Sequence, residues 1–470
     1  MFNYTGTYTD LYQLKMAQVY FLKKKKNHVA IFDYFFRKLP FEGGYAVFAG
    51  LEDFLETLKN LYFDKHDLAF LQTQGFHPDF ISYLKNFRFE GSVYAAHEGE
   101  LVFPTCPVIT IEAHIIEAQI IETLLLNIIN FQTLIATKAS RIRQVAGNRE
   151  LIDFGLRRAQ GPGGYYASRA AIIGGFNATS NVRAGRDYNI PISGTMAHSF
   201  IQSYDDELLA FRDFADVNPD NCIVLVDTYN TLKSGVPNAI RLGKEMETHR
   251  QCLKGIRLDS GDLAYLSKKA RQMLNEAGLD YVKIIASNQL DEYVIQSLLE
   301  QEAPIDAFGV GTSLVIGRPD AALDGVYKLA FANHRPCIKL SETTAKITLP
   351  YKKQVYRVID HDGAFWGADI IALEDEDKLD IIHLPFGALK SLSTKNYKHE
   401  PLLHKVMEQG KRITSPKTLQ EIAQYAQQSL DRLPAEYKCF NNPLPYKVGL
   451  SNRLKVQRDQ LIEEYKGKSE

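Results

Sequence analysis

The chain is poor in cysteine, and its few cysteines are scattered. Five occur in 470 residues, and no two of them form a CxxC pair. Because a disulfide framework needs paired cysteines and a zinc site needs clustered ligands, neither is indicated. The composition therefore favours a reducing compartment, which we expect to be the cytoplasm.

The chain also lacks an excess of charge and long apolar runs. Its 55 basic and 56 acidic residues give a net charge of -1, so there is no general attraction to nucleic acid or to a membrane surface. The start MFNYTGTYTDLYQ is unlike the core of a signal peptide, and no charge-free apolar segment could span a bilayer. We expect a protein that binds neither nucleic acid nor membrane, in which any phosphate binding is local.

Common hydrolase signatures are missing as well. The pattern GxSxG does not occur, and none of the cysteines stands in a recognisable catalytic context. Acyl-transfer hydrolysis is therefore not favoured.

From residue 151 onward, short apolar runs alternate with amphipathic stretches. The runs end at Phe154, Thr195, Asp227, Asp259, Ser287 and Thr312. Alternating strands and helices are typical of a parallel sheet, and this number of units favours closure into a barrel. Because catalytic groups of such barrels lie at the carboxyl ends of the strands, we expect the active site there.

The length of the chain indicates more than one domain. We expect an N-terminal α/β domain, a TIM-like α/β barrel that holds the active site, and a C-terminal β-rich and helical region, at residues 1–135, 136–330 and 331–470. The elements expected outside the barrel are helices over residues 11–22, 45–61, 114–145 and 402–428, a strand over residues 29–36, and antiparallel strands within residues 326–341, 345–359 and 364–374.

Residues 151–204 combine groups that handle anions. Arg157 and Arg158 can clamp a carboxylate or phosphate, and a glycine-rich turn follows them. His198 follows a Gly-Thr turn in GTMAHSF, which favours a proton carrier or nucleophile over a structural histidine. This stretch predicts an anion-binding active site.

The heptad RLDSGDL places a cation and two carboxylates directly after a strand. Arg257 and Asp259 favour a functional site, whereas Asp262 alone is better explained as a helix cap. Asp227 ends the preceding strand, which is weaker evidence. Paired carboxylates beside a phosphate or diphosphate ligand suit Mg²⁺ and sugar hydroxyls, so the heptad fits a ligand of that kind.

A glycine-rich turn ends the last strand of the expected barrel. In DAFGVGTSL the amides of Gly309 and Gly311 and the hydroxyl of Thr312 could cradle a phosphate. An ordinary tight turn is the alternative. The late position in the barrel favours phosphate.

Several long motifs resemble the nicotinate phosphoribosyltransferase family. They are DLYQ, FRKLPFEGGYAVFAGL, DFGLRRAQGP, GTMAHSF, LVDTYNTLKSGVPNAI, GIRLDSGDL, DAFGVGTSL and VYKLAFANHRPCIKLSE. The resemblance implies a type II phosphoribosyltransferase barrel with an N-terminal α/β domain, usually a homodimer with shared active sites. It also implies that nicotinate and phosphoribosyl pyrophosphate give nicotinate mononucleotide and pyrophosphate, with hydrolysis of ATP. This reaction is the first step of NAD biosynthesis from nicotinate.

The resemblance also implies roles for single residues. His198 matches the histidine that ATP phosphorylates, and Thr195 and Arg257 match positions that contact nicotinate. Thr312 matches a position that binds the phosphoribosyl donor, and Arg157 plausibly holds carboxylate or phosphate oxygens.

The other matches concern the pyridine ring, the ribose and the metal. Tyr12 matches a tyrosine that reaches the ring from the neighbouring subunit, and Phe154 resembles an aromatic residue on the opposite face. Asp227 and Asp259 match acidic groups near the ribose and Mg²⁺.

Substrate choice is expected to depend partly on Ser180 in NATSNV. A relative that uses nicotinamide has a carboxylate at the matching position, where it accepts a hydrogen bond from the amide. The neutral Ser180 avoids repulsion of a nicotinate carboxylate, which favours the acid over the amide.

Two other functions stay open on the residues alone. One is a phosphate-binding barrel without catalysis, against which the intact His198, Arg257, Asp259 and Thr312 argue. The other is a phosphosugar lyase or isomerase, which would need a barrel-strand lysine for Schiff-base chemistry or an acid/base pair on a metal. Lys254 and Lys283 lie at strand starts, the wrong end for that chemistry.

Overall fold

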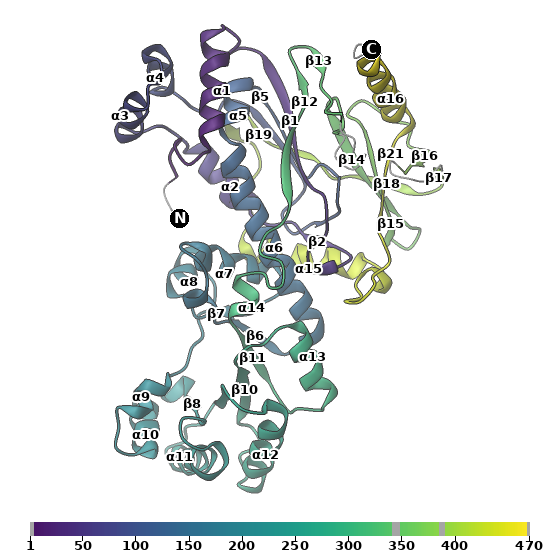
Figure 1. Cartoon of the computed structure of the whole chain (residues 1–470). Coiled ribbons are helices and arrows are strands. Elements are labelled where there is room, and N and C mark those ends of the chain that lie inside the picture. The colour runs from purple at the N-terminus through teal and green to yellow at the C-terminus, as the bar shows by residue number, and fades with distance from the viewer. Residues whose placement is uncertain (1–3, 341–347, 385–390, 468–470) are drawn as a thin grey trace. The chain divides into compact units, whose positions relative to one another are not determined.

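The computed structural model describes residues 4–340, 348–384 and 391–467. The chain forms two compact units, and Figure 1 gives the order of their elements. Unit 1 contains residues 1–137 and 322–470, and unit 2 contains residues 138–321. Within the described ranges, no helix has both the length and the apolar character needed to cross a membrane.

Unit 1 is built around a seven-stranded sheet with the order β13-β12-β1-β5-β3-β19-β20. The interior strand β1 has the sequence VAIFDYFF and pairs antiparallel with β12 and β5. These strands are β1 (Val29–Phe36), β3 (Ser92–Ala95), β5 (Ile109–His114), β12 (Gly325–Ala332), β13 (Arg335–Pro336), β19 (His404–Glu408) and β20 (Lys411–Arg412). The helices of this unit are α1 (Leu11–Leu22), α2 (Leu51–Lys59), α3 (Lys65–Thr73), α4 (Pro78–Leu84), α5 (Ile115–Ile120), α15 (Leu419–Arg432) and α16 (Asn452–Lys466). A short ribbon of β2 (Ala46–Val47) and β4 (Leu101–Val102) accompanies them.

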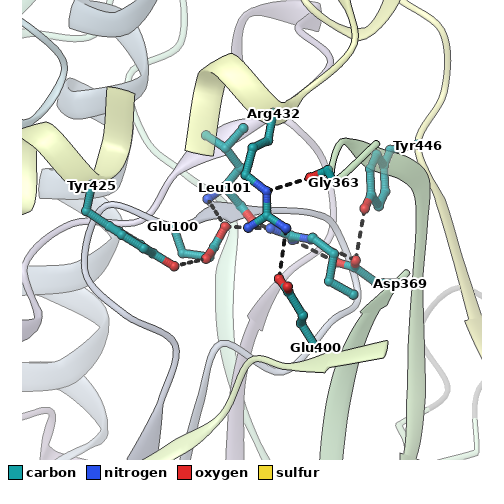
Figure 2. A network of polar contacts seen from close by, with 9 residues as sticks. Glu100, Leu101, Gly363, Asp369, Glu400, Tyr425, Arg432 and Tyr446 are labelled. Carbon is teal, nitrogen blue, oxygen red and sulfur yellow. Dashed lines mark hydrogen bonds and ion pairs between the residues drawn. The ribbon is translucent and has the colours of Figure 1, made fainter. Parts of the chain in front are cut away.

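A second sheet of unit 1 has the order β17-β16-β21-β15-β14-β18. Its strands are β14 (Lys353–Ile359), β15 (Phe365–Leu373), β16 (Ile381–His383), β17 (Ser391–Ser393), β18 (Lys398–Pro401) and β21 (Lys447–Leu450). The side chain of Arg357, on β14, is fully buried and forms ion pairs with Glu100 and Asp369. Figure 2 shows this network, in which Tyr425 donates to Glu100 and Tyr446 donates to Asp369.

The Arg357 network and the first sheet explain why the two ends of the chain share one unit. Glu100 belongs to the N-terminal stretch and Asp369 to the C-terminal stretch, and both neutralise the same guanidinium. In the first sheet, β12 and β19 from the C-terminal stretch pair with β1 and β3. The contacts therefore join the stretches that the sequence placed in residues 1–135 and 331–470, and they place β12 outside the unit that holds the parallel sheet.

Unit 2 contains a curled six-stranded parallel sheet with the order β7-β6-β11-β10-β9-β8. Its strands are β6 (Glu150–Asp153), β7 (Ala178–Thr179), β8 (Ile223–Leu225), β9 (Gly255–Leu258), β10 (Lys283–Ser287) and β11 (Ala307–Val310). The helices are α7 (Gly163–Ile173), α8 (Val182–Tyr188), α9 (His198–Gln202), α10 (Glu207–Val217), α11 (Val236–Thr248), α12 (Leu263–Glu276), α13 (Glu292–Glu300) and α14 (Thr312–Val315). Figure 1 shows α11, α12 and α13 beside the strands. Helix α6 (Glu122–Ala146) runs from one unit into the other.

The parallel sheet confirms the predicted α/β class. Its strands are nearly continuous apolar runs because helices cover them, and Val224, Ile256, Ile284 and Phe308 are fully buried. Among the described strands β7 and β8 form the two edges, and no ladder joins them. The parallel sheet is thus a curled half-barrel of the TIM type.

Helix α1 and strand β1 have the predicted bounds, whereas several other predicted elements differ from the structure. The helix predicted over residues 45–61 begins only at Leu51, because residues 46–47 pair with β4. The run IPISGT was expected as a strand, but it makes only an isolated bridge between Ile192 and Thr179.

The prediction of a helix over residues 402–428 was wrong in its first half. Those residues form β19 and β20, and the helix begins at Leu419 after the capping box of Thr418 and Glu421. Part of the strands predicted within residues 326–341 and 345–359 lies outside the described residues.

Candidate active site

Two neighbouring cavities lie at the carboxyl edge of the parallel sheet in unit 2. Their volumes are about 580 and 430 Å³. Both are lined by Phe154, Arg157, Arg257 and Asp259. The first cavity also includes Ser180, Thr195 and His198, and the second includes Gly309, Gly311 and Thr312. Ten residues predicted from scattered motifs are thus brought together around one shared wall.

Arg257 stands at the centre of this wall, at the end of β9, and three hydroxyl or carboxylate groups hold it. Its Nε donates to Ser287 Oγ at 2.8 Å, Nη1 to Thr195 Oγ1 at 3.2 Å and Nη2 to Asp259 Oδ1 at 2.8 Å. The guanidinium lies 5.1 Å from the centre of the Phe154 ring. An arginine has five N–H donors, so two remain for a ligand beside an aromatic face.

His198 begins helix α9 and faces Asp227. Its Nε2 lies 3.3 Å from Asp227 Oδ1, and its side chain is 39% exposed whereas that of Asp227 is 1% exposed. The other oxygen of Asp227 accepts hydrogen bonds from the Asp259 amide at 3.0 Å and from Ser260 Oγ at 2.5 Å. A fixed carboxylate therefore orients an imidazole that stays accessible to a second reactant.

Asp259 is held in its charged form. Partial burial raises the pKa of this carboxyl. The hydrogen bond from Ser287 and the positive charge of Arg257 together lower the pKa by more than burial raises it, so it lies below the usual value of 3.8. Asp259 is therefore a carboxylate at neutral pH.

Phe154 is fixed by the glycine of the neighbouring strand and by the buried residue before it. A Cβ atom on Gly309 would lie 2.3 Å from the Phe154 ring, so this position leaves no room for a side chain. Asp153 accepts hydrogen bonds from Gly155 N at 2.8 Å, from Ser168 Oγ at 2.7 Å and from a threonine of β7. Burial raises the pKa of Asp153 although these bonds oppose the shift. The DFG turn is thus rigid, and it presents the aromatic ring to both cavities.

Replacement of Gly309 by alanine is expected to raise the KM for nicotinate, the substrate that the family resemblance implies, about tenfold. The added methyl group must displace the Phe154 ring, and overpacking of this kind costs about 1–3 kcal/mol. Steady-state kinetics of Gly309→Ala checks this result. Gly194→Ala is the matched control, because a Cβ at Gly194 of the same cavity wall meets no atom within 4 Å. An unchanged KM in Gly309→Ala would show that the ring position does not matter.

Several residues of the cavities were not among the predicted site residues. They include Ser287, Asn288, Gln289 and Arg318, all lining the second cavity. Asn288 and Gln289 have positive φ angles of 89° and 48°, an uncommon conformation that is frequent at functional sites. Ser287 was named among the strand ends at which the active site was expected, but it was given no role of its own. Arg318 had no recognisable signal.

Two predicted residues lie outside the cavity walls. Asp227 contacts the site through His198 and the Asp259 amide. Tyr12 lies in unit 1 on α1 and is 49% exposed, so its role stays a prediction. Asp262 caps α12 by accepting from the Tyr265 amide at 3.0 Å, which is the structural role expected for it.

The carboxylates at the site suit a cation that arrives with its ligand. Among the described residues no group of three or more His, Cys, Asp or Glu side chains could hold a metal. Mg²⁺ in proteins is often bound by one or two carboxylates together with phosphates of the substrate. One oxygen of Asp259 has no hydrogen-bond donor among the described residues, whereas both oxygens of Asp227 have partners. The site therefore fits Mg²⁺ better through Asp259 than through Asp227.

The fold and the site together define an α/β protein with aromatic and anion-binding groups at the carboxyl edge of a parallel sheet. Family models agree along the chain: the nicotinate phosphoribosyltransferase (NAPRTase) N-terminal domain matches residues 7–130, the NAPRTase family matches 149–358, and the nicotinate phosphoribosyltransferase C-terminal domain matches 352–458.

Individual relatives agree with the family models. The chain is 47% identical to the nicotinate phosphoribosyltransferase of Bacillus subtilis over 98% of this chain and 96% of the relative, and 36% identical to that of Caenorhabditis elegans over 95% and 91%. The crystal structure of human nicotinic acid phosphoribosyltransferase has 30% identity, covers 96% of this chain and 99% of its own, and superposes with a TM-score of 0.87. The chain belongs to the nicotinate phosphoribosyltransferase family.

Proposed function

We propose that the chain transfers the phosphoribosyl group of phosphoribosyl pyrophosphate to nicotinate, which gives nicotinate mononucleotide and pyrophosphate for NAD biosynthesis. The observation that supports this most directly is Arg257, held by three side chains beside the Phe154 ring on the wall shared by both cavities. The relatives named above support the same reaction.

Nicotinate is a flat ring with one negative charge, and the shared wall matches both properties. The Phe154 ring can stack on the pyridine, and the two remaining N–H groups of Arg257 can donate to the carboxylate. Ser180, in the first cavity, adds no negative charge opposite that carboxylate. The acid is therefore favoured over the amide.

The second cavity suits the phosphorylated donor. Arg157, Arg158 and Arg318 supply positive charge, and Gly311 and Thr312 supply backbone and hydroxyl donors. Cleavage of the bond between the ribose C1 and pyrophosphate builds positive charge on the sugar and negative charge on the leaving group. Asp259 is placed to stabilise the sugar, and the arginines to stabilise the leaving group. Mg²⁺ bound beside Asp259 would neutralise diphosphate charge.

His198 is the residue we propose for coupling to ATP. It is accessible in the first cavity and oriented by Asp227, so its imidazole can accept a phosphoryl group. The added negative charge would stand near the shared wall and favour a state with higher affinity for the donor and its cation. Hydrolysis of the phosphohistidine would then release the products.

Replacement of His198 by alanine is expected to abolish the stimulation of turnover by ATP and to leave only the basal transfer. The variant lacks the nitrogen that would accept the phosphoryl group. Turnover with and without ATP, together with mass-spectrometric detection of phosphohistidine, measures both effects. His249→Ala is the control, since His249 lies at the end of α11 and outside both cavities. Full ATP-coupled turnover by His198→Ala would exclude the coupling mechanism.

We further propose a cytoplasmic homodimer in which Tyr12 of one copy completes the ring site of the other. The exposed side chain of Tyr12 on α1 is available for such a contact.

The experiment that tests the proposed reaction is a product balance. Purified protein is incubated with nicotinate, phosphoribosyl pyrophosphate, Mg²⁺ and ATP, and the products are quantified by chromatography and mass spectrometry. We expect one pyrophosphate for each nicotinate mononucleotide, with ADP and phosphate. Consumption of the donor without nicotinate mononucleotide would overturn the proposal in favour of another phosphosugar reaction.

A further inference from the structure

We propose that Ser287 is a positioning residue that holds Arg257 and Asp259 in register for nicotinate binding. This inference rests on the proposed function, because it assigns a task to a side chain of the same site.

The Ser287 hydroxyl is used in both directions at once. Its oxygen accepts from Arg257 Nε at 2.8 Å, and its proton is donated to Asp259 Oδ1. The same Asp259 oxygen accepts from Arg257 Nη2 at 2.8 Å. The three groups therefore form a closed ring of hydrogen bonds, in which the hydroxyl fixes both the rotation of the guanidinium and the carboxylate that pairs with it.

The position of Ser287 makes this ring rigid. The residue ends β10, whose neighbours β9 and β11 hold its backbone on both sides, and its exposure is only 2%. Arg257 comes from β9 and is largely shielded, with 14% of its side chain exposed. Because a serine has one short side-chain torsion, little freedom remains once both bonds are made. A hydroxyl on one strand thus orients a cation on the next strand.

The orientation matters because only two N–H groups of Arg257 remain for a carboxylate. They have to point along the Phe154 ring if the ring and the charge of one nicotinate are to be recognised together. Without the Ser287 hydroxyl, Arg257 keeps its contacts with Thr195 and Asp259. It loses the hydrogen bond from Nε that restricts rotation of the guanidinium about the Cδ–Nε bond. The positive charge then stays in the site, but the N–H groups that would bind the carboxylate are less well oriented.

The test is steady-state kinetics of Ser287→Ala beside the wild-type protein. The variant is expected to raise the KM for nicotinate about tenfold while kcat at saturation changes less than about threefold, because Asp259 keeps its hydrogen bond from Arg257 Nη2 and the main loss is in nicotinate binding. The melting temperature is measured on the same samples to report on the fold. Ser267→Ala is the matched control, since Ser267 is a fully buried serine of the same unit that bonds only to a backbone carbonyl of α12.

The outcomes separate this inference from the proposed function. A raised KM for nicotinate in Ser287→Ala with an unchanged melting temperature, and no change of KM in Ser267→Ala, supports the positioning role. An unchanged KM, or a loss of thermal stability with an unchanged KM, overturns it and leaves the proposed reaction intact. Absence of nicotinate mononucleotide with the wild-type protein overturns the reaction and this inference with it.

Discussion

Replacement of Arg257 by alanine is expected to lower kcat/KM for nicotinate by about 100-fold or more. Removing one member of a shielded, hydrogen-bonded charge pair costs about 2–5 kcal/mol, much of it from the partner left behind. Here the partner is Asp259, which would face the nicotinate carboxylate without the guanidinium between them. The variant thus loses an attraction and gains a repulsion.

A lysine at the same position is not expected to restore activity. The planar guanidinium of Arg257 donates to Ser287, Thr195 and Asp259 and has further N–H groups for a ligand. Lysine has a single ammonium group, which cannot make all these hydrogen bonds at once. Arg271→Ala is the control, because Arg271 lies on α12 and bonds to Asp280 and Val282 carbonyls away from both cavities. Steady-state kinetics would contradict this account if Arg257→Ala kept kcat/KM within about threefold of the wild type.

Replacement of Arg357 by methionine is expected to destabilise unit 1 by about 3–5 kcal/mol. Methionine fills similar space but leaves Glu100 and Asp369 buried without their counter-charge. Tyr425 and Tyr446 would still donate to these carboxylates, and two tyrosine hydroxyls do not replace a guanidinium. Because the network joins the two ends of the chain, its loss weakens the whole unit (Figure 2).

Tryptophan fluorescence during urea denaturation measures this change selectively. The single tryptophan of the chain is Trp366, on β15 of unit 1. Arg453→Met is the control, since the ion pair of Arg453 with Asp375 is exposed and contributes about 0–1 kcal/mol. Equal unfolding midpoints for Arg357→Met and Arg453→Met would refute the structural role assigned to Arg357.

Residues at the ends of parallel strands were the most predictable part of the site. Apolar runs identify such strands, and the strand ends of a parallel sheet meet at one edge, so Phe154, Arg257, Asp259 and Thr312 could be grouped before the structure was known. Ser287 was not singled out, although it ends such a strand, because a serine gains its role only from partners on β9. Short side chains have no sequence signal for such a contact.

The association of the two chain ends could not be predicted for a different reason. Strands β1 and β12 are far apart in sequence, and their antiparallel register depends on which surfaces meet after folding. The alternation of apolar residues identifies a strand and does not identify its partner. The same limit applies to Arg357, because nothing in the sequence identifies Glu100 and Asp369 as its partners.

The most direct test of the central claim compares the acid with the amide. Wild-type protein is incubated with phosphoribosyl pyrophosphate, Mg²⁺ and ATP, with nicotinate in one tube and nicotinamide in another, and the mononucleotides are measured by mass spectrometry. Arg257 and the neutral Ser180 predict nicotinate mononucleotide from the acid and no mononucleotide from the amide. Equal or faster conversion of nicotinamide, or no product from either compound, would contradict the account.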